Sequence, residues 1–173
     1  MGPRTILSTA YAYAYPFFTK IVDTVQPKHE MALGYFLAFE EKYPLYLVDI
    51  GDADLAVRYK QGKGVPIVFI HGSWDDHHLW MSDAARLACS VRNPILLYDR
   101  RGHSASTPDK EQGSVFQDVK DALLLLKYFN FSKAHFVGHS YGATIAIQLT
   151  TEYSERVESL FIYEPPIKRD LRI

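Results

Sequence analysis

The sequence predicts an α/β fold in which a mostly parallel, doubly wound sheet follows an antiparallel N-terminal hairpin. Two short strand-like runs, 45–50 and 55–59, flank the residues Gly51 to Asp54, which is typical of a hairpin turn. Four later runs are almost entirely apolar, which indicates strands covered on both faces, as in a parallel sheet. They span 67–70, 95–98, 135–137 and 160–163. Stretches with helical spacing separate these runs, so strand and helix alternate along the chain.

Helices are expected before the hairpin and between the later strands. The stretch 29–43 places apolar residues at helical spacing, and Pro44 ends it. Further helices are expected over 76–90, 114–129 and 140–153. In the second of these, Ser114 is the expected N-cap, and Gln117 three residues later gives a capping-box pattern.

The composition restricts the classes of function. The chain has 173 residues, 47% of them hydrophobic, which is enough for one domain with a buried core. Its formal net charge of -1 argues against a nucleic-acid partner. The single cysteine, Cys89, cannot form an internal disulfide and is expected to be a small core residue in a helix. A reducing, cytoplasmic compartment is therefore expected.

Residues 1–44 are expected to form an N-terminal extension that precedes the domain spanning 45–173. The stretch 5–18 is mostly apolar and contains Ala-Tyr-Ala repeats that resemble a signal-peptide cleavage site. Secretion or membrane association through this segment is therefore the alternative location. Pro16 interrupts the run and charged residues follow it, so the run is too short to span a bilayer. We expect the extension to dock on the domain or at a membrane interface.

The strongest functional motif is Gly138-His139-Ser140-Tyr141-Gly142, which lies between a predicted strand and a predicted helix. Such a turn forces its central residue into strained backbone geometry and projects the Ser140 hydroxyl from the top of the sheet. The following helix points its N–H groups toward the same place, where they stabilise a negative charge. The sequence therefore predicts Ser140 as a nucleophile and the Tyr141 amide as a donor to an oxyanion.

A second oxyanion donor is expected in the loop after the third strand. This loop has the sequence His71-Gly72-Ser73-Trp74, with a glycine where the backbone must approach a substrate. The Ser73 amide is the candidate donor, and the Trp74 amide is the alternative. Trp74 and His139 are also expected to line the pocket.

Four segments together resemble the α/β-hydrolase superfamily, in particular its small esterase, lactonase and haloperoxidase-like branch. They are His71 to Trp74, Tyr98 to Ser106, Gly138 to Gly142 and Tyr163 to Pro166. The resemblance covers about 45–167, and Ser104 replaces a glycine that is usual in the second segment. It implies an α/β-hydrolase fold, no cofactor, and hydrolysis of a small-molecule ester or lactone through an acyl-enzyme on Ser140. Serine rather than aspartate at this position argues against the epoxide hydrolase and haloalkane dehalogenase branches.

The same resemblance implies that part of the catalytic machinery is missing from this sequence. In that superfamily the triad runs in the order serine, acid, histidine, and no histidine follows His139 here. We expect six strands, without the last two strands of the fold and without the usual base. Glu164 is a possible acid, and a structural Glu-Pro-Pro turn is the alternative. Because serine without a base is a poor nucleophile, the alternative function is an inactive truncated product or a pseudoenzyme that binds ligands.

The remaining histidines are expected to be structural. His71 and His103 are expected to fix loop shape through hydrogen bonds, and the His139 ring is expected to point away from the Ser140 hydroxyl. The run 75–78, Asp-Asp-His-His, lacks the ligand order of metallo-β-lactamase-type hydrolases. We expect it to start a helix, and we expect no metal site.

Two further expectations concern ion pairs and the sheet edge. Asp99, Arg100 and Arg101 are expected to form structural ion pairs near the top of the sheet. The sixth strand is expected to leave an unpaired apolar edge, so poor solubility or self-association through this edge is expected.

Overall fold

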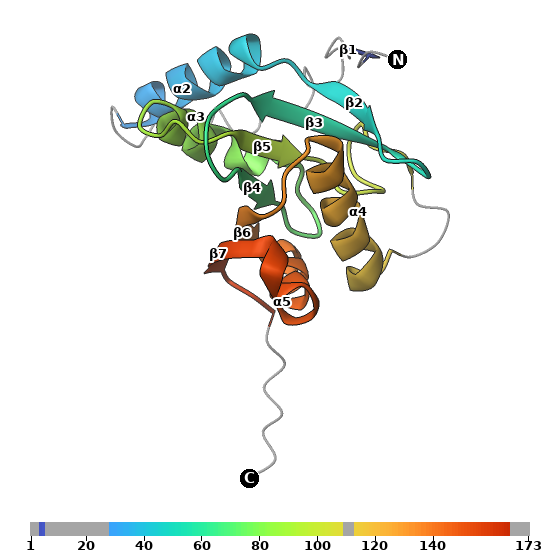
Figure 1. Cartoon of the computed structure of the whole chain (residues 1–173). Coiled ribbons are helices and arrows are strands. Elements are labelled where there is room, and N and C mark those ends of the chain that lie inside the picture. Colours follow the sequence, from blue (N-terminus) through green and yellow to red (C-terminus); the bar gives the residue numbers. More distant parts are fainter. Residues whose placement is uncertain (1–3, 6–27, 109–112, 167–173) are drawn as a thin grey trace.

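The computed structural model describes residues 4–5, 28–108 and 113–166 (Figure 1). Most of the apolar stretch 5–18 lies outside these ranges, so the expectations about secretion or membrane docking through it stay predictions. Within the described ranges, none of the helices has both the length and the apolar character needed to cross a bilayer.

A seven-stranded sheet forms the centre of the molecule, in the order β1-β2-β3-β5-β4-β6-β7. The strands are β1 (Arg4–Thr5), β2 (Tyr46–Asp49), β3 (Asp54–Lys60), β4 (Ile67–Ile70), β5 (Ile95–Tyr98), β6 (Ala134–His139) and β7 (Val157–Tyr163). Strands β5, β4, β6 and β7 are mutually parallel, whereas β1, β2 and β3 pair antiparallel and β3 is antiparallel to β5. The predicted hairpin and the mostly parallel sheet are confirmed. The two-residue strand β1 was not predicted, so the sheet has one strand more than expected.

The helices largely follow the predicted ranges. They are α2 (Lys28–Lys42), α3 (Met81–Ala88), α4 (Val115–Tyr128) and α5 (Tyr141–Glu152), with the short 3-10 helices η2 (His77–Trp80) and η3 (Ser154–Arg156). Ser114 caps α4 by accepting a hydrogen bond from the Gln117 amide. The Gln117 side chain donates instead to Asp121, so only one half of the predicted capping box forms.

The helix predicted over 76–90 is wrong in two respects. It begins as the 3-10 helix η2, with Asp76 as the N-cap, whose side chain accepts a hydrogen bond from the His78 amide. It also ends at Ala88, so Cys89 lies at the C-terminal cap. Cys89 is exposed, which corrects the prediction that it is a core residue.

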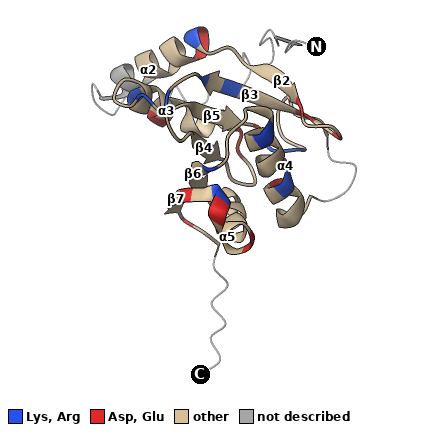
Figure 2. Ribbon diagram, in the orientation of Figure 1, with Lys and Arg blue, Asp and Glu red and all other residues tan. Residues whose placement is uncertain are grey.

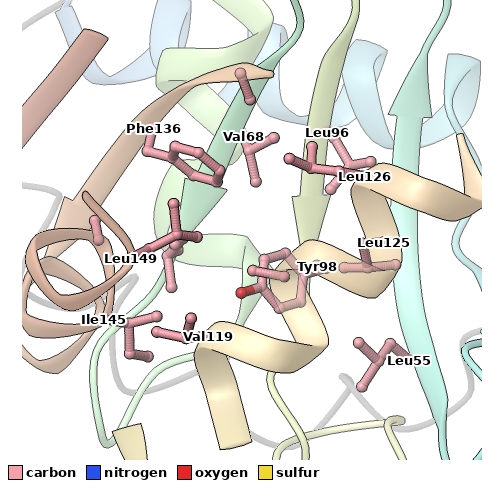
Figure 3. Close-up of a cluster of buried hydrophobic side chains, with 14 of the residues drawn as sticks. Leu55, Val68, Leu96, Tyr98, Val119, Leu125, Leu126, Phe136, Ile145 and Leu149 are labelled. Carbon is pink, nitrogen blue, oxygen red and sulfur yellow. The ribbon is translucent and has the colours of Figure 1, made fainter. Parts of the chain in front are cut away.

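Alternating side chains of the central strands pack against helices on both faces of the sheet. Val68, Leu96 and Tyr98 contribute to the face covered by α4 and α5 (Figure 3). Phe69 and Leu97 lie on the opposite face with residues of α2, η2 and α3. Burial on both faces explains why these strands read as continuous apolar runs. Charged residues of both signs are interspersed along the outer elements (Figure 2).

The N-terminal extension docks on the domain through α2. Helix α2 packs beside α3, and Phe39 enters the core on that face of the sheet. The buried guanidinium of Arg58 in β3 donates to the carbonyl oxygens of Glu40 and Tyr43 and pairs with the Glu40 carboxylate at 3.0 Å. Burial lowers the pKa of Arg58, and the Glu40 charge opposes that shift. A buried arginine needs such partners, so this contact anchors the end of α2 on the sheet.

Strand β7 is the edge of the sheet next to β6 (Figure 1). Helix α5 packs against it, yet large apolar side chains stay uncovered along the strand. Phe161 and Tyr163 are 60% and 51% exposed. Among the described residues, no strand pairs with the outer edge of β7. An exposed apolar edge of this kind is a template for pairing with another chain.

We propose that this edge makes the chain self-associate. Size-exclusion chromatography with light scattering should show dimers or larger species at micromolar concentrations, and Phe161→Lys should shift them toward the monomer. The matched control is Phe116→Lys, because Phe116 is 65% exposed but lies on α4, away from the edge. A wild-type monomer that unfolds cooperatively would contradict the proposal.

Candidate active site

Ser140 occupies a sharp turn between β6 and α5. Its backbone has φ 51° and ψ -119°, a region that non-glycine residues rarely adopt and that costs about 1–3 kcal/mol. The Ser140 amide donates to the Tyr163 carbonyl oxygen at 2.9 Å, and the Ser140 carbonyl accepts from the Ala143 amide at 2.9 Å. These bonds hold the strained turn on both sides. The predicted backbone geometry is confirmed, and Ser140 is partly exposed at the start of a helix.

The two glycines of the motif are required by close backbone contacts. A Cβ on Gly142 would lie 2.3 Å from the Ile70 carbonyl oxygen and 2.6 Å from that of His71. A Cβ on Gly138 would lie 2.6 Å from the Gly142 carbonyl oxygen. The absence of these side chains therefore lets β6, α5 and the end of β4 meet beneath Ser140.

The predicted oxyanion loop lies directly against the Ser140 turn. A Cβ on Gly72 would lie 3.2 Å from Cβ of Ser140, so the loop backbone passes over the candidate nucleophile. Tyr141 is the first residue of α5, which places its amide at the positive end of that helix. The structure thus places the backbone at Gly72 beside Ser140. The roles of the Ser73 and Tyr141 amides as oxyanion donors stay predictions.

Trp74 does not enclose this site. Its side chain is fully exposed, so it forms no buried wall within the part of the chain that the structure describes. Its expected pocket role stays a prediction.

The His71 ring holds the loop His71–Trp74 in place through two hydrogen bonds. Its Nε2 accepts a hydrogen bond from the Arg100 amide at 2.9 Å, so the ring proton lies on Nδ1, which donates to the Gly72 carbonyl at 2.8 Å. Burial, and secondly the charge of Arg100, lower the pKa of His71 to about 3. The ring is therefore neutral near pH 7, and both nitrogens are occupied. The predicted structural role of His71 is confirmed.

His103 holds the next part of the loop. Its Nδ1 is 3.0 Å from the Arg101 carbonyl oxygen, and its Nε2 is 3.0 Å from both the Ser73 carbonyl oxygen and Nη2 of Arg100. This confirms the predicted role in fixing loop shape. Ser104, beside it, has φ 48°, a conformation that favours the glycine usual at this position in the superfamily.

His139 lies between two carboxylates beside the site. Its Nδ1 is 3.4 Å from Oδ2 of Asp75, and its Nε2 is 3.7 Å from Oε2 of Glu164. Nδ1 of His139 also lies 3.3 Å from the position that a Cβ on Gly72 would take, and Cβ of Ser140 lies 3.2 Å from the same position. The expected direction of the ring, away from the Ser140 hydroxyl, and its expected pocket role stay predictions. The sequence did not predict the contact of Asp75 with His139. An acidic residue before a helix is explained by its interaction with the helix N-terminus, so nothing pointed to a second partner.

Glu164 follows β7 directly. It has φ 49°, and its side chain is 68% exposed. The positive φ of Glu164 fits a turn at this position. Its carboxylate nevertheless lies 3.7 Å from Nε2 of His139, the residue before the candidate nucleophile. The role of Glu164 as an acid stays a prediction.

A cluster of potential metal ligands consists of Asp76, His77 and His78. Their potential ligand atoms all lie within 4.8 Å of one another. However, Nδ1 of His77 faces Asp99 at 2.7 Å, whereas Nδ1 of His78 faces Asp76 at 2.9 Å. Both Nδ1 atoms are therefore already engaged by carboxylates, and the two ring centroids lie 4.0 Å apart. The geometry fits the start of η2, as expected from the sequence.

Arg100 and Arg101, after β5, form the predicted structural ion pairs, whereas the Asp99 side chain forms hydrogen bonds with His77. Arg100 pairs with Asp118 at 3.3 Å, and Arg101 pairs with Asp121 at 2.8 Å. Asp99 is fully buried and accepts from the His77 amide and from His77 Nδ1. These contacts join the end of β5 to α4 and η2.

Comparisons with known proteins agree with this geometry. Residues 67–171 match the model of the family described as "Alpha/beta hydrolase family". The chain is 32% identical over 110 residues to 3-oxoadipate enol-lactonase 1 of Acinetobacter baylyi, covering 62% of this chain and 40% of that protein. It is 30% identical over 97 residues to the dihydrolipoyllysine-residue acetyltransferase component of the acetoin cleaving system of Pseudomonas putida, covering 56% and 26%.

A solved structure has the same fold. It is that of Est816, an N-acyl homoserine lactone degrading enzyme, with a TM-score of 0.62 and 27% identity. The match covers 69% of this chain and 45% of that one. The chain therefore spans less than half the length of each of these relatives.

Proposed function

Because the chain belongs to the alpha/beta hydrolase family, we propose that it hydrolyses carboxylic esters or lactones through an acyl-enzyme on Ser140. The observation that carries the proposal is the strained turn at Ser140, with φ 51°, against which the Gly72 backbone packs. A strained serine at the start of a helix, facing a loop of backbone amides, is an arrangement suited to acyl transfer. The similarity to a lactonase and to a lactone-degrading enzyme supports this substrate class.

The chemistry proceeds in two steps. Oγ of Ser140 attacks the substrate carbonyl carbon, and its proton passes to a base. The oxyanion accepts hydrogen bonds from the amides of Tyr141 and Ser73. Its collapse breaks the bond to the alkoxy oxygen, which takes the proton back from the base, and leaves an acyl-enzyme. The alcohol of an ester then departs, whereas the new hydroxyl of an opened lactone stays on the acyl chain. Water gives a proton to the base as its oxygen attacks the acyl-enzyme carbonyl, and the base returns that proton to Oγ, which releases the acid and regenerates the Ser140 hydroxyl. Amides that are held in place before reaction stabilise this charge without reorganisation.

The alternative is that the chain is an inactive truncated protein or a pseudoenzyme, which binds ligands but does not hydrolyse them. One observation favours it: the ring nitrogens of His71 and His103 are occupied by contacts within the loops. These two histidines are therefore poorly placed to accept the serine proton. The catalytic proposal requires another base, and Glu164 could orient one.

A fluorophosphonate probe distinguishes the two functions, because it reacts with activated serines. The folded wild-type chain should be labelled, whereas Ser140→Ala should show no labelling above background. Ser132→Ala is the matched control, since Ser132 is an exposed serine before β6, and it should keep wild-type labelling. Absence of labelling on the folded wild-type chain would reject the catalytic proposal for this chain and leave the binding alternative.

A further inference from the structure

Resting on the proposed function, we propose that Arg100 is a positioning residue that presets both oxyanion donors. Arg100 contacts no candidate reacting atom. Its guanidinium instead contacts the peptide group that carries the Ser73 amide and the side chain of Tyr141, whose amide is the second donor. One buried side chain thus connects two loops that are far apart in the sequence.

The first contact orients the Ser73 amide. Nη2 of Arg100 donates to the Gly72 carbonyl oxygen at 2.9 Å, and Nδ1 of His71 donates to the same oxygen at 2.8 Å. The Gly72 carbonyl and the Ser73 amide belong to one planar peptide group, in which C=O and N–H point in opposite directions. Fixing the oxygen therefore fixes the direction of the Ser73 N–H. A carbonyl polarised by a cation also makes its own N–H a stronger donor.

The second contact supports the Tyr141 donor. Cζ of Arg100 lies 4.8 Å from the centre of the Tyr141 ring, within the range of a cation–π contact. The ring is thereby held next to the start of α5. Since the oxyanion must meet both amides at once, a common support keeps their separation constant.

The charge of Arg100 is not available to a substrate. The side chain is 5% exposed, and its Nη1 lies 3.3 Å from both carboxylate oxygens of Asp118, which is itself buried. The Arg100 amide also donates to Nε2 of His71, which selects the tautomer that binds Gly72. The residue therefore acts by orienting the loop and not by attracting an anionic ligand.

Lysine could not make the same set of contacts. The guanidinium meets Asp118 with one nitrogen and Gly72 with another, and its Cζ lies over the Tyr141 ring. An ammonium is a compact point charge without a planar face. The shape of arginine, rather than its charge alone, is therefore required.

The test compares Arg100→Met and Arg100→Lys with Arg101→Met. Arg101 is the matched control, because it is the adjacent arginine and pairs with Asp121 and Asp52 without contacting the oxyanion loop. Acylation of Ser140 by p-nitrophenyl acetate, and its phosphonylation by the fluorophosphonate probe, should be about 10–100-fold slower in Arg100→Met, a loss below that of a deleted oxyanion donor. KM for the ester should change little. Arg100→Lys should recover only part of the rate, and Arg101→Met should keep it.

Nuclear magnetic resonance gives a second measurement that does not need activity. In Arg100→Met and in Arg100→Lys, the Gly72 carbonyl carbon and the amides of Ser73 and Tyr141 should shift, whereas Arg101→Met should leave them in place. Wild-type acylation rates in folded Arg100→Met, or unchanged resonances in either Arg100 variant, would overturn the positioning role. If wild type is not labelled at Ser140, the proposed function fails, and the resonances still decide whether Arg100 orients the loop.

Discussion

Gly142→Ala should lower the free energy of unfolding by more than about 3 kcal/mol, as expected for overpacking against a rigid backbone. The added Cβ would lie 2.3 Å from the carbonyl oxygen of Ile70 and 2.6 Å from that of His71. Neither neighbour is a flexible side chain, so β4 or α5 would have to move. Because Ser140 is the N-cap of α5 and the Gly72 backbone after β4 packs against it, fluorophosphonate labelling should be lost together with stability.

The matched control for this substitution is Gly34→Ala in α2. A Cβ on Gly34 would meet nothing within 4 Å, so alanine should stabilise the helix by about 0.5–1 kcal/mol. Chemical denaturation should give a lower free energy of unfolding for Gly142→Ala and a higher one for Gly34→Ala than for the wild type. If Gly142→Ala unfolds at the wild-type denaturant concentration, the close packing beneath Ser140 is contradicted.

Acidification should destabilise the protein through His71. Burial lowers its folded-state pKa to about 3, below the value of about 6.5 expected in the unfolded chain. The unfolded state therefore binds the proton more tightly, so this contribution to stability is complete above pH 6.5 and is lost as the pH falls toward 3. The loss is about 1.4 kcal/mol for each pH unit within this window. Protonation would also remove the acceptor for the Arg100 amide and so loosen the oxyanion loop.

The measurement is the free energy of unfolding between pH 7 and pH 5. His77, whose pKa is also lowered by burial, contributes to the same wild-type slope, so the comparison must remove one histidine at a time. His71→Gln should flatten the slope, because glutamine can donate and accept but does not titrate in this range. His135→Gln is the control for the loss of a histidine. His135 lies near the start of β6, at the opposite end of that strand from Ser140. Equal slopes in wild type and His71→Gln would contradict the prediction.

The strands and the serine turn could be predicted because their signals are local. Continuous apolar runs identified β4 and β5 residue for residue, since strands buried on both faces contain few polar positions. The spacing of Gly138, Ser140 and Gly142 identified the turn. Gly138 avoids a contact with Gly142 and Ala143 within the same segment, whereas Gly142 avoids the carbonyl oxygens of Ile70 and His71. The same reasoning failed at Cys89 and at the start of η2, because apolar spacing does not show where a helix ends or tightens.

By itself, then, the sequence determined the α/β architecture, the position of the strained serine and the loop expected to face it. The tertiary structure alone decided how the site is held together. Arg100 and Gly72 are separated by 28 positions, and Asp75 meets His139 from a different strand connection. Local periodicity and turn chemistry carry no information on such pairs. They depend on the parallel order β5-β4-β6, which brings the carboxyl ends of three strands to one edge of the sheet.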